Sequence, residues 1–73
     1  MANSISERKL SFLRRPKVEK RTGLSRSTIY LRIKNGTFPK PVKLGERSVG
    51  WIESEVDEWL ESRVQSRNEE FER

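Results

Sequence analysis

Apolar positions in the first part of the chain come in short, interrupted runs, which predicts short elements. The run LSFL at residues 10–13 indicates a brief extended segment that lies on the core. Pro16 suits the first turn of a helix, where its missing N–H costs nothing, so residues 16–22 predict about two helical turns. Gly23 follows as a sharp turn, because glycine adopts φ > 0 without a Cβ clash.

The next segment predicts a second helix from Arg26 to about Asn35. Ser25 is its expected N-cap, since its hydroxyl can accept a hydrogen bond from the backbone N–H two or three residues later. Asn35 and Gly36 end this helix by the usual C-terminal chemistry. The turn at Gly23 therefore joins two short helices.

The stretch TFPKPVKL at residues 37–44 is not helical, because each proline removes a backbone donor and biases the preceding residue toward extended geometry. Beyond it, apolar and polar residues alternate on both sides of Gly45, Glu46 and Arg47. That alternation predicts a β-hairpin with its tip near residues 45–48. Its apolar positions are Val42, Leu44, Val49 and Trp51.

From Glu53 the apolar spacing changes to i, i+3, i+4 and i+8, which predicts a helix with one buried face. The residues on that face are Val56, Trp59, Leu60 and Val64. Residues 65–73 predict either a weak continuation of this helix or a frayed tail. Residues 1–9 are polar and lack periodicity, so we expect a flexible arm there, which leaves residues 10–64 as the folded domain.

The order of the predicted elements is that of a helix-turn-helix with a wing: a short helix, a glycine turn, a second helix and a hairpin. The predicted fold class is therefore mainly α with a small β-hairpin, a winged helix-turn-helix domain. At 73 residues the chain is near the lower size at which one hydrophobic core supports folding. We expect that core to consist of Leu13, Val18, Leu24, Ile29, Ile33, Phe38, Val42, Trp51, Val56, Trp59 and Leu60.

Composition excludes several classes of function. The chain has no cysteine and no histidine, which removes disulfides, thiolate metal sites and the commonest general base. We therefore expect no enzymatic activity, no metal, no cofactor and no small-molecule ligand. No run approaches the roughly 18 apolar residues of a membrane span, and the first ten residues lack a signal-peptide core. The expectation is a cytoplasmic, nucleoid-associated protein that does not bind membranes.

The net charge of +5 conceals a sharp division along the chain. Up to Ile52 there are 13 Lys or Arg residues against three acids, a net charge of +10. From Glu53 onward there are three arginines against eight acids, a net charge of −5. Such a division favours a polyanionic partner for the first part of the chain and repels one from the second.

A 100° helical wheel separates two faces of the second predicted helix. Ile29 and Ile33 fall on one side, with Ser25 beside them, and would face the core. The opposite side carries the residues expected to face DNA: Ser27, Leu31 and Lys34, with Thr28 and Tyr30 flanking them. Arg26 lies at the border in the first turn, where its guanidinium can contact a guanine edge or clamp a phosphate. We predict that Arg26 is the leading base reader.

Each of these positions has a structural alternative. Ser25 either caps the helix only or also contacts phosphate. Tyr30 is either a half-buried aromatic with a solvated hydroxyl or a phosphate contact. Lys34 either contacts DNA or is ordinary surface charge. Leu31 meets a thymine methyl, a second subunit or only solvent.

Two further basic groups flank the second helix. Lys40, Lys43 and Arg47 lie on or near the predicted hairpin, where a wing can reach the adjacent minor groove or the backbone, unless the turn is basic only for solubility. Five residues around the first helix would contact phosphates without reading sequence: Arg14, Arg15, Lys17, Lys20 and Arg21.

Three segments, LRRPKVEKRTGLSRSTIY, IKNGTFPKPVKLG and ERSVGWIESEVDEWLESR, together span about residues 10–63. They resemble the AlpA family of prophage regulators, small proteins related to phage excisionases and to MerR-class winged helix-turn-helix proteins. The resemblance implies a DNA-binding protein encoded in or near a mobile element. Helix-turn-helix sequences of this kind often place a basic residue and then an apolar one after the tyrosine. Here Leu31 precedes Arg32, so the sequence leaves open which of the two faces DNA.

The prediction for function is site-selective binding of double-stranded DNA and regulation of prophage or genomic-island genes, such as those for integrase or excision. One alternative is an excisionase-like recombination directionality factor that bends DNA at attachment sites. Another is a protein-interaction module that uses its acidic C-terminal helix. The operator, the sign of regulation and the oligomeric state are open, and dimers or cooperative arrays on DNA fit the small size of the domain.

Overall fold

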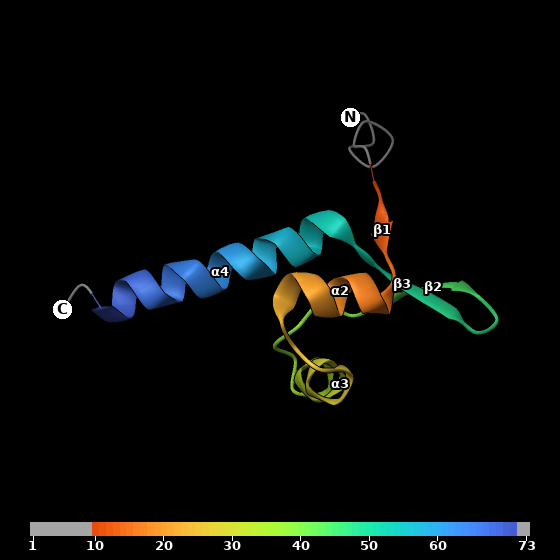
Figure 1. Cartoon of the computed structure of the whole chain (residues 1–73), viewed down its shortest axis with the longest axis horizontal. Coiled ribbons are helices and arrows are strands. Elements are labelled where there is room, and N and C mark those ends of the chain that lie inside the picture. The colour runs from red at the N-terminus through yellow and green to blue at the C-terminus, as the bar shows by residue number, and fades with distance from the viewer. Residues whose placement is uncertain (1–9, 72–73) are drawn as a thin grey trace.

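The computed structural model describes residues 10–71, so the predicted arm at residues 1–9 lies outside the described part (Figure 1). The elements in chain order are β1 (Phe12–Leu13), α2 (Arg15–Thr22), α3 (Arg26–Lys34), β2 (Val42–Gly45), β3 (Ser48–Ile52) and α4 (Glu53–Phe71). The two short helices, the hairpin and the long last helix confirm the predicted fold class. The domain is a winged helix-turn-helix.

The short strand β1 turns the hairpin into a small three-stranded antiparallel sheet. The strand order is β1-β3-β2, which makes β3 the central strand. Phe12 lies opposite Ile52 and Leu13 opposite Trp51, whereas Val42 of β2 lies opposite Gly50. The extended segment at residues 10–13 was predicted, but its pairing with β3 was not.

The turn between α2 and α3 follows the chemistry that the sequence indicates. Gly23 has φ 75°, and its N–H donates to the carbonyl of Glu19 at 2.8 Å. The Thr22 hydroxyl donates to the carbonyl of Val18 at 2.8 Å and accepts from the N–H of Leu24 at 3.2 Å. These bonds hold the chain between the helices while Leu24 packs against the core.

The core lies where α2, α3 and α4 meet the inner face of the sheet. Its buried residues are Val18, Ile29, Phe38, Trp51 and Val56, and the partly buried residues around them are Leu13, Leu24, Ile33, Val49, Trp59 and Leu60. Ten of the eleven predicted core residues belong to this cluster. Val42 does not, because it sits on the edge strand β2, and Val49 of the central strand joins the core instead.

Both tryptophans are fixed by hydrogen bonds to the loop after α3. The Trp51 indole N–H donates to the carbonyl of Pro39 at 2.9 Å, and that of Trp59 donates to the carbonyl of Thr37 at 2.7 Å. Phe38, between the two carbonyls, packs edge-on against Trp59 with 4.9 Å between ring centroids. The loop is therefore pinned to β3 and α4 on either side of a buried aromatic side chain.

The long helix α4 leaves the domain after its first turns (Figure 1). Val64 was predicted to lie on its buried face, and this is wrong: its exposure is 49%. The helix continues to Phe71, so residues 65–71 extend it instead of fraying. No helix in residues 10–71 is long and apolar enough to cross a membrane.

Candidate nucleic-acid interface

Helix α3 presents one face to the core and the other to solvent. Ile29 is fully buried, with 0% exposure, which fixes the rotation of the helix about its axis. The outward residues Arg26, Ser27 and Lys34 are all exposed, as the helical wheel predicts. The face of α3 opposite buried Ile29 is therefore mostly polar and basic.

At the start of α3, Ser25 acts as the predicted N-cap. Its hydroxyl accepts from the Thr28 N–H at 3.3 Å and donates to the Thr28 hydroxyl at 3.0 Å. Thr28 is consequently half-buried. The first intrahelical bond runs from the N–H of Ile29 to the carbonyl of Ser25, so the N–H groups of Arg26 and Ser27 precede it. Such free N–H groups at a positive dipole end suit a phosphate.

Tyr30 connects α3 to the sheet. Its ring lies edge-on to Trp51, with 6.2 Å between centroids and 64° between planes, and the residue is 38% exposed. Arg26 precedes Tyr30 by one helical turn on the same side, since residues four apart are neighbours on a helix. The ring of Tyr30 therefore has a packing role, and Arg26 lies one turn before it on the same side of α3.

The structure decides how Leu31 and Arg32 are oriented. Leu31 is 58% exposed, the most exposed of the large apolar residues of the described chain. Arg32 is half-buried, and its Nε is shielded without a hydrogen-bond partner within residues 10–71. Leu31 therefore belongs to the outer face of α3, whereas the stem of Arg32 lies along the edge of the core.

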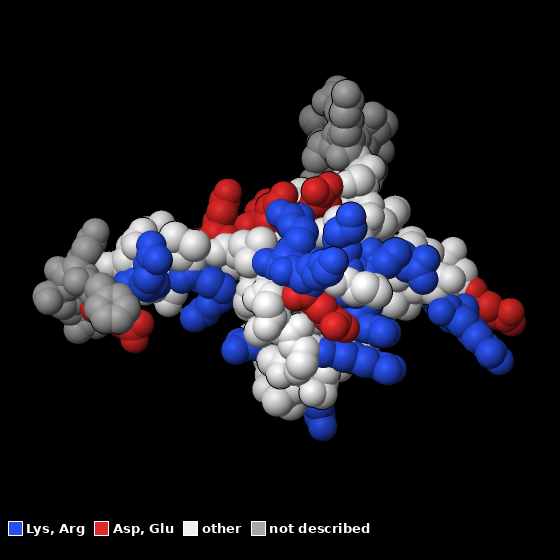
Figure 2. All heavy atoms as spheres, in the orientation of Figure 1, with Lys and Arg blue, Asp and Glu red and all other residues white. Residues whose placement is uncertain are grey.

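The wing carries exposed basic residues beside this helix. Lys43 lies on β2, opposite Val49 of β3. The two-residue tip between Gly45 and Ser48 consists of Glu46 and Arg47. Both Lys43 and Arg47 are exposed. Figure 2 shows basic side chains over α2, along the hairpin and on the far half of α4, and acidic side chains around the start of α4, beside α2 and at the wing tip.

Two of the five basic residues predicted to contact phosphate around α2 are engaged within the domain instead. Arg15 pairs with Glu19 at 3.0 Å. Arg21 pairs with Asp57 and, at 3.5 Å, with Glu53, which ties the end of α2 to the start of α4. Sequence reasoning missed this link, because nothing in a sequence marks opposite charges more than 30 residues apart as partners. Arg14, Lys17 and Lys20 take part in none of the three salt bridges found within residues 10–71.

Taken together, a capped helix with a polar outer face, a basic hairpin beside it and a bracing helix behind it define the class of winged helix-turn-helix proteins. Residues 11–64 match the family described as "Prophage CP4-57 regulatory protein (AlpA)". The chain therefore belongs to the AlpA family, a family of prophage regulators and not of enzymes.

Two relatives support this membership. The chain is 53% identical over 57 residues to the "DNA-binding transcriptional activator AlpA" of Escherichia coli (strain K12), covering 70% of this chain and 81% of that protein. It is 50% identical over 56 residues to the "Uncharacterized protein ORF88" of Enterobacteria phage P4. That alignment covers 77% of this chain and 64% of the phage protein.

Proposed function

We propose that this protein binds double-stranded DNA site-selectively and regulates transcription of prophage or genomic-island genes, including those that control integration and excision. The observation that carries the proposal is the outer face of α3, where Arg26, Ser27 and Leu31 stand exposed in front of buried Ile29. Membership of a family of prophage regulators and the name of the E. coli relative, a DNA-binding transcriptional activator, support it.

In this proposal α3 lies in the major groove and its residues divide into two roles. Arg26 reads a base, most simply a guanine through a bidentate contact, with Ser27 beside it and Leu31 against a thymine methyl. Ser25 and Thr28 mainly build the helix start, and the free N–H groups there donate hydrogen bonds to a phosphate. On the side of α3 and the wing, phosphates or the minor groove are contacted by the hydroxyl of Tyr30 and by Lys34, Lys43 and Arg47. Around α2, further phosphates are contacted by Arg14, Lys17 and Lys20.

The test is a footprint on DNA upstream of the protein's own gene and its neighbours, followed by titration at several salt concentrations. With about five phosphate contacts, log K should fall with log salt with a slope of roughly −4 to −5. Absence of salt-sensitive binding to any duplex from that neighbourhood would refute the proposal. The footprint length and its repeat spacing would also show whether one copy, a dimer or a cooperative array occupies the site.

A recombination role uses the same fold, because an exposed recognition helix and a wing can also bend DNA at attachment sites. A purified excision reaction without transcription separates the two roles. Loss of excision when this protein is omitted would make it a directionality factor. Unchanged excision, together with an altered promoter-reporter signal in cells, would support the transcriptional role.

A further inference from the structure

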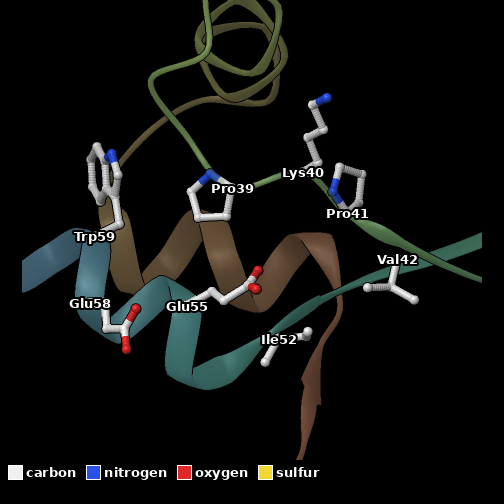
Figure 3. A pocket seen from close by; sticks show the side chains of 8 residues that line it. All are labelled: Pro39, Lys40, Pro41, Val42, Ile52, Glu55, Glu58 and Trp59. Atoms are coloured by element: carbon white, nitrogen blue, oxygen red, sulfur yellow. The ribbon is translucent and has the colours of Figure 1, made fainter.

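An open groove of about 720 Å³ lies between the start of α4 and the segment that leads from α3 into the wing (Figure 3). One wall is formed by residues 39–42, and the other by Ile52 and three residues of α4. Most of its surface is apolar, contributed by Pro39, Pro41, Val42, Ile52 and Trp59. The α4 wall adds two carboxylates, Glu55 and Glu58.

The acidic residues at the start of α4 fall into two groups. Glu53 and Asp57 both pair with Arg21. Glu55 and Glu58 line the groove, and neither takes part in the salt bridges found in residues 10–71. The amine of Lys40, on the opposite wall, points away from both carboxylates and toward α3 (Figure 3). The groove therefore combines an apolar surface with two uncompensated negative charges.

The walls of the groove are held in place before anything binds. The Trp59 ring is fixed by its hydrogen bond to the Thr37 carbonyl at 2.7 Å and by its packing on Phe38. Pro39 and Pro41 restrict the backbone of the opposite wall. A site that is already formed loses little conformational entropy on binding, which favours recognition of even a short segment.

We propose that this groove binds an extended segment of a partner protein in which a lysine or arginine is flanked by apolar residues. Glu55 and Glu58 are three positions apart on one helix face, so a single cation can lie between them. The flanking apolar side chains bury the surface of Pro41, Val42 and Ile52. DNA is not the occupant, because the two carboxylates repel phosphate.

A different protein fits the groove better than a second copy of this chain. Within residues 10–71, a lysine flanked by apolar residues occurs at residues 39–41. This segment forms one wall of the groove and is held by the hydrogen bonds of both tryptophans to the loop, so it is not free to enter the groove of a second copy. The groove and α3 lie on opposite sides of the segment at residues 39–41 (Figure 3). This step rests on the proposed function. The groove stays accessible while α3 is bound to DNA, and the partner protein in the groove transmits the regulatory effect.

Peptide titration of the whole protein tests the binding chemistry without reference to DNA. The probes are the synthetic peptides APLKPVA and APLEPVA, and the signals are the two indole N–H resonances. The lysine peptide should shift the signal of Trp59, which lines the groove, more than that of Trp51, which is buried and reaches the groove only through its hydrogen bond to the Pro39 carbonyl. No shift at Trp59, or equal affinity for the two peptides, would overturn the proposal.

A matched pair of charge variants assigns the effect to the groove. Glu55→Gln with Glu58→Gln should weaken binding of the lysine peptide by about tenfold, the effect of losing roughly 1.4 kcal/mol. The control, Glu61→Gln with Glu69→Gln, makes the same charge change on exposed positions of α4 outside the groove and should bind as the wild type does. Equal weakening of peptide binding in both variants would show that the peptide is attracted non-specifically to negative charge, and would refute the groove as the binding site.

A reporter assay and a footprint, run on the same variants, test the regulatory step. The Glu55, Glu58 double variant should leave the footprint unchanged and reduce regulation by about tenfold, whereas the control should match the wild type. If the wild type itself leaves no footprint, the proposed function is refuted, and the peptide titration still tests whether the groove binds the lysine peptide. Sedimentation shows whether the wild type forms a dimer that the double variant does not form. Such a dimer would identify a second copy as the occupant of the groove and refute the proposal of a different partner protein.

Discussion

Leu31 and Arg32 are neighbours in sequence, yet the helix turns them to different surroundings. Successive residues are rotated by about 100°, so Leu31 lies opposite buried Ile29, whereas Arg32 lies near the core edge. The 58% exposure of Leu31 leaves an apolar side chain where a surface helix usually carries a polar one. Under the proposed function, the Leu31 side chain adds base selectivity by contacting a thymine methyl, and the Arg32 side chain packs at the edge of the core.

Replacement of Arg26 tests base reading at the scale of one residue. Arg26→Ala should lower discrimination at one base pair by about 1–3 kcal/mol, because the bidentate contact is lost while the fold is unaffected. The measurement is titration of operator duplexes with each base substituted in turn. Arg26→Lys is the matched control, since it keeps the charge but lacks the planar fork. Equal losses on operator and random DNA would instead identify Arg26 as a phosphate clamp.

At the scale of elements, the central strand β3 links every layer of the domain. It pairs with β1 on one side and with β2 on the other, and α2 and α4 pack against it. Gly50 lies where the flanking strands come close: a Cβ there would be 2.9 Å from the Leu44 side chain and 3.3 Å from the Phe12 Cβ. A side chain at this position would require the exposed Leu44 side chain to move and β1 to shift by a few tenths of an ångström.

Substitution of this glycine should loosen the sheet. Gly50→Ala should destabilise the domain by about 1–3 kcal/mol, the usual effect of overpacking. The matched control is Gly45→Ala, where the nearest atom to a new Cβ is 3.7 Å away, an ordinary contact distance. Thermal melting followed by circular dichroism measures both variants. Equal melting temperatures for the two variants would show that β1 does not pack against Gly50 in solution.

The connection between α2 and α4 depends on Arg21. Arg21→Ala should reduce stability by no more than about 1 kcal/mol, because partly exposed ion pairs contribute little, and should leave the salt dependence of DNA binding unchanged. Lys20→Ala, next to it on the exposed side of α2, should leave stability unchanged and reduce the salt slope by about one. Urea unfolding and DNA titration separate the two effects. A reduced salt slope for the Arg21 variant would show that DNA displaces its acidic partners.

At the scale of the whole molecule, a small core holds together a chain with opposite charges in its two parts. Five hydrophobic residues are buried within residues 10–71, and Trp51 is the largest of them, fully enclosed and hydrogen-bonded to Pro39. The basic part of the chain builds α2, α3 and the wing, while the acidic part builds α4, whose far half projects away from the core (Figures 1 and 2). The two parts meet where Arg21 pairs with Glu53 and Asp57, and Figure 2 also shows basic side chains along the far half of α4.

Loss of the central tryptophan should affect the entire domain. Trp51→Ala should cost about 3–5 kcal/mol, a large part of the stability of so small a protein, because it leaves a cavity among three helices and the sheet. Val64→Ala, at a position with 49% exposure, should change stability by no more than about 0.5 kcal/mol. The measurement is urea unfolding followed by circular dichroism. A large loss in the Val64 variant would mean that the far half of α4 packs against something in solution.

Local rules predicted most of the elements and the outer face of α3. Ser25 as a cap, Gly23 as a left-handed turn and the prolines before the hairpin act within a few residues, so the sequence displays them directly. Val64 was misplaced by the same reasoning, because helical periodicity shows which residues share a face but not how far the rest of the domain reaches along the helix. The DNA contacts themselves remain predictions.

The sequence by itself determined the element order, the winged helix-turn-helix class, the division of charge and the family. Each of these depends on interactions between near neighbours or on the order of residues. Only the tertiary structure decided that β1 pairs with β3, that Arg21 joins α2 to α4, and that Leu31 faces outward while Arg32 lines the core edge. It alone assembled the groove between residues 39–42 and α4. These features bring together residues distant in the chain, and their contacts depend on how packed elements are oriented, which no local pattern encodes.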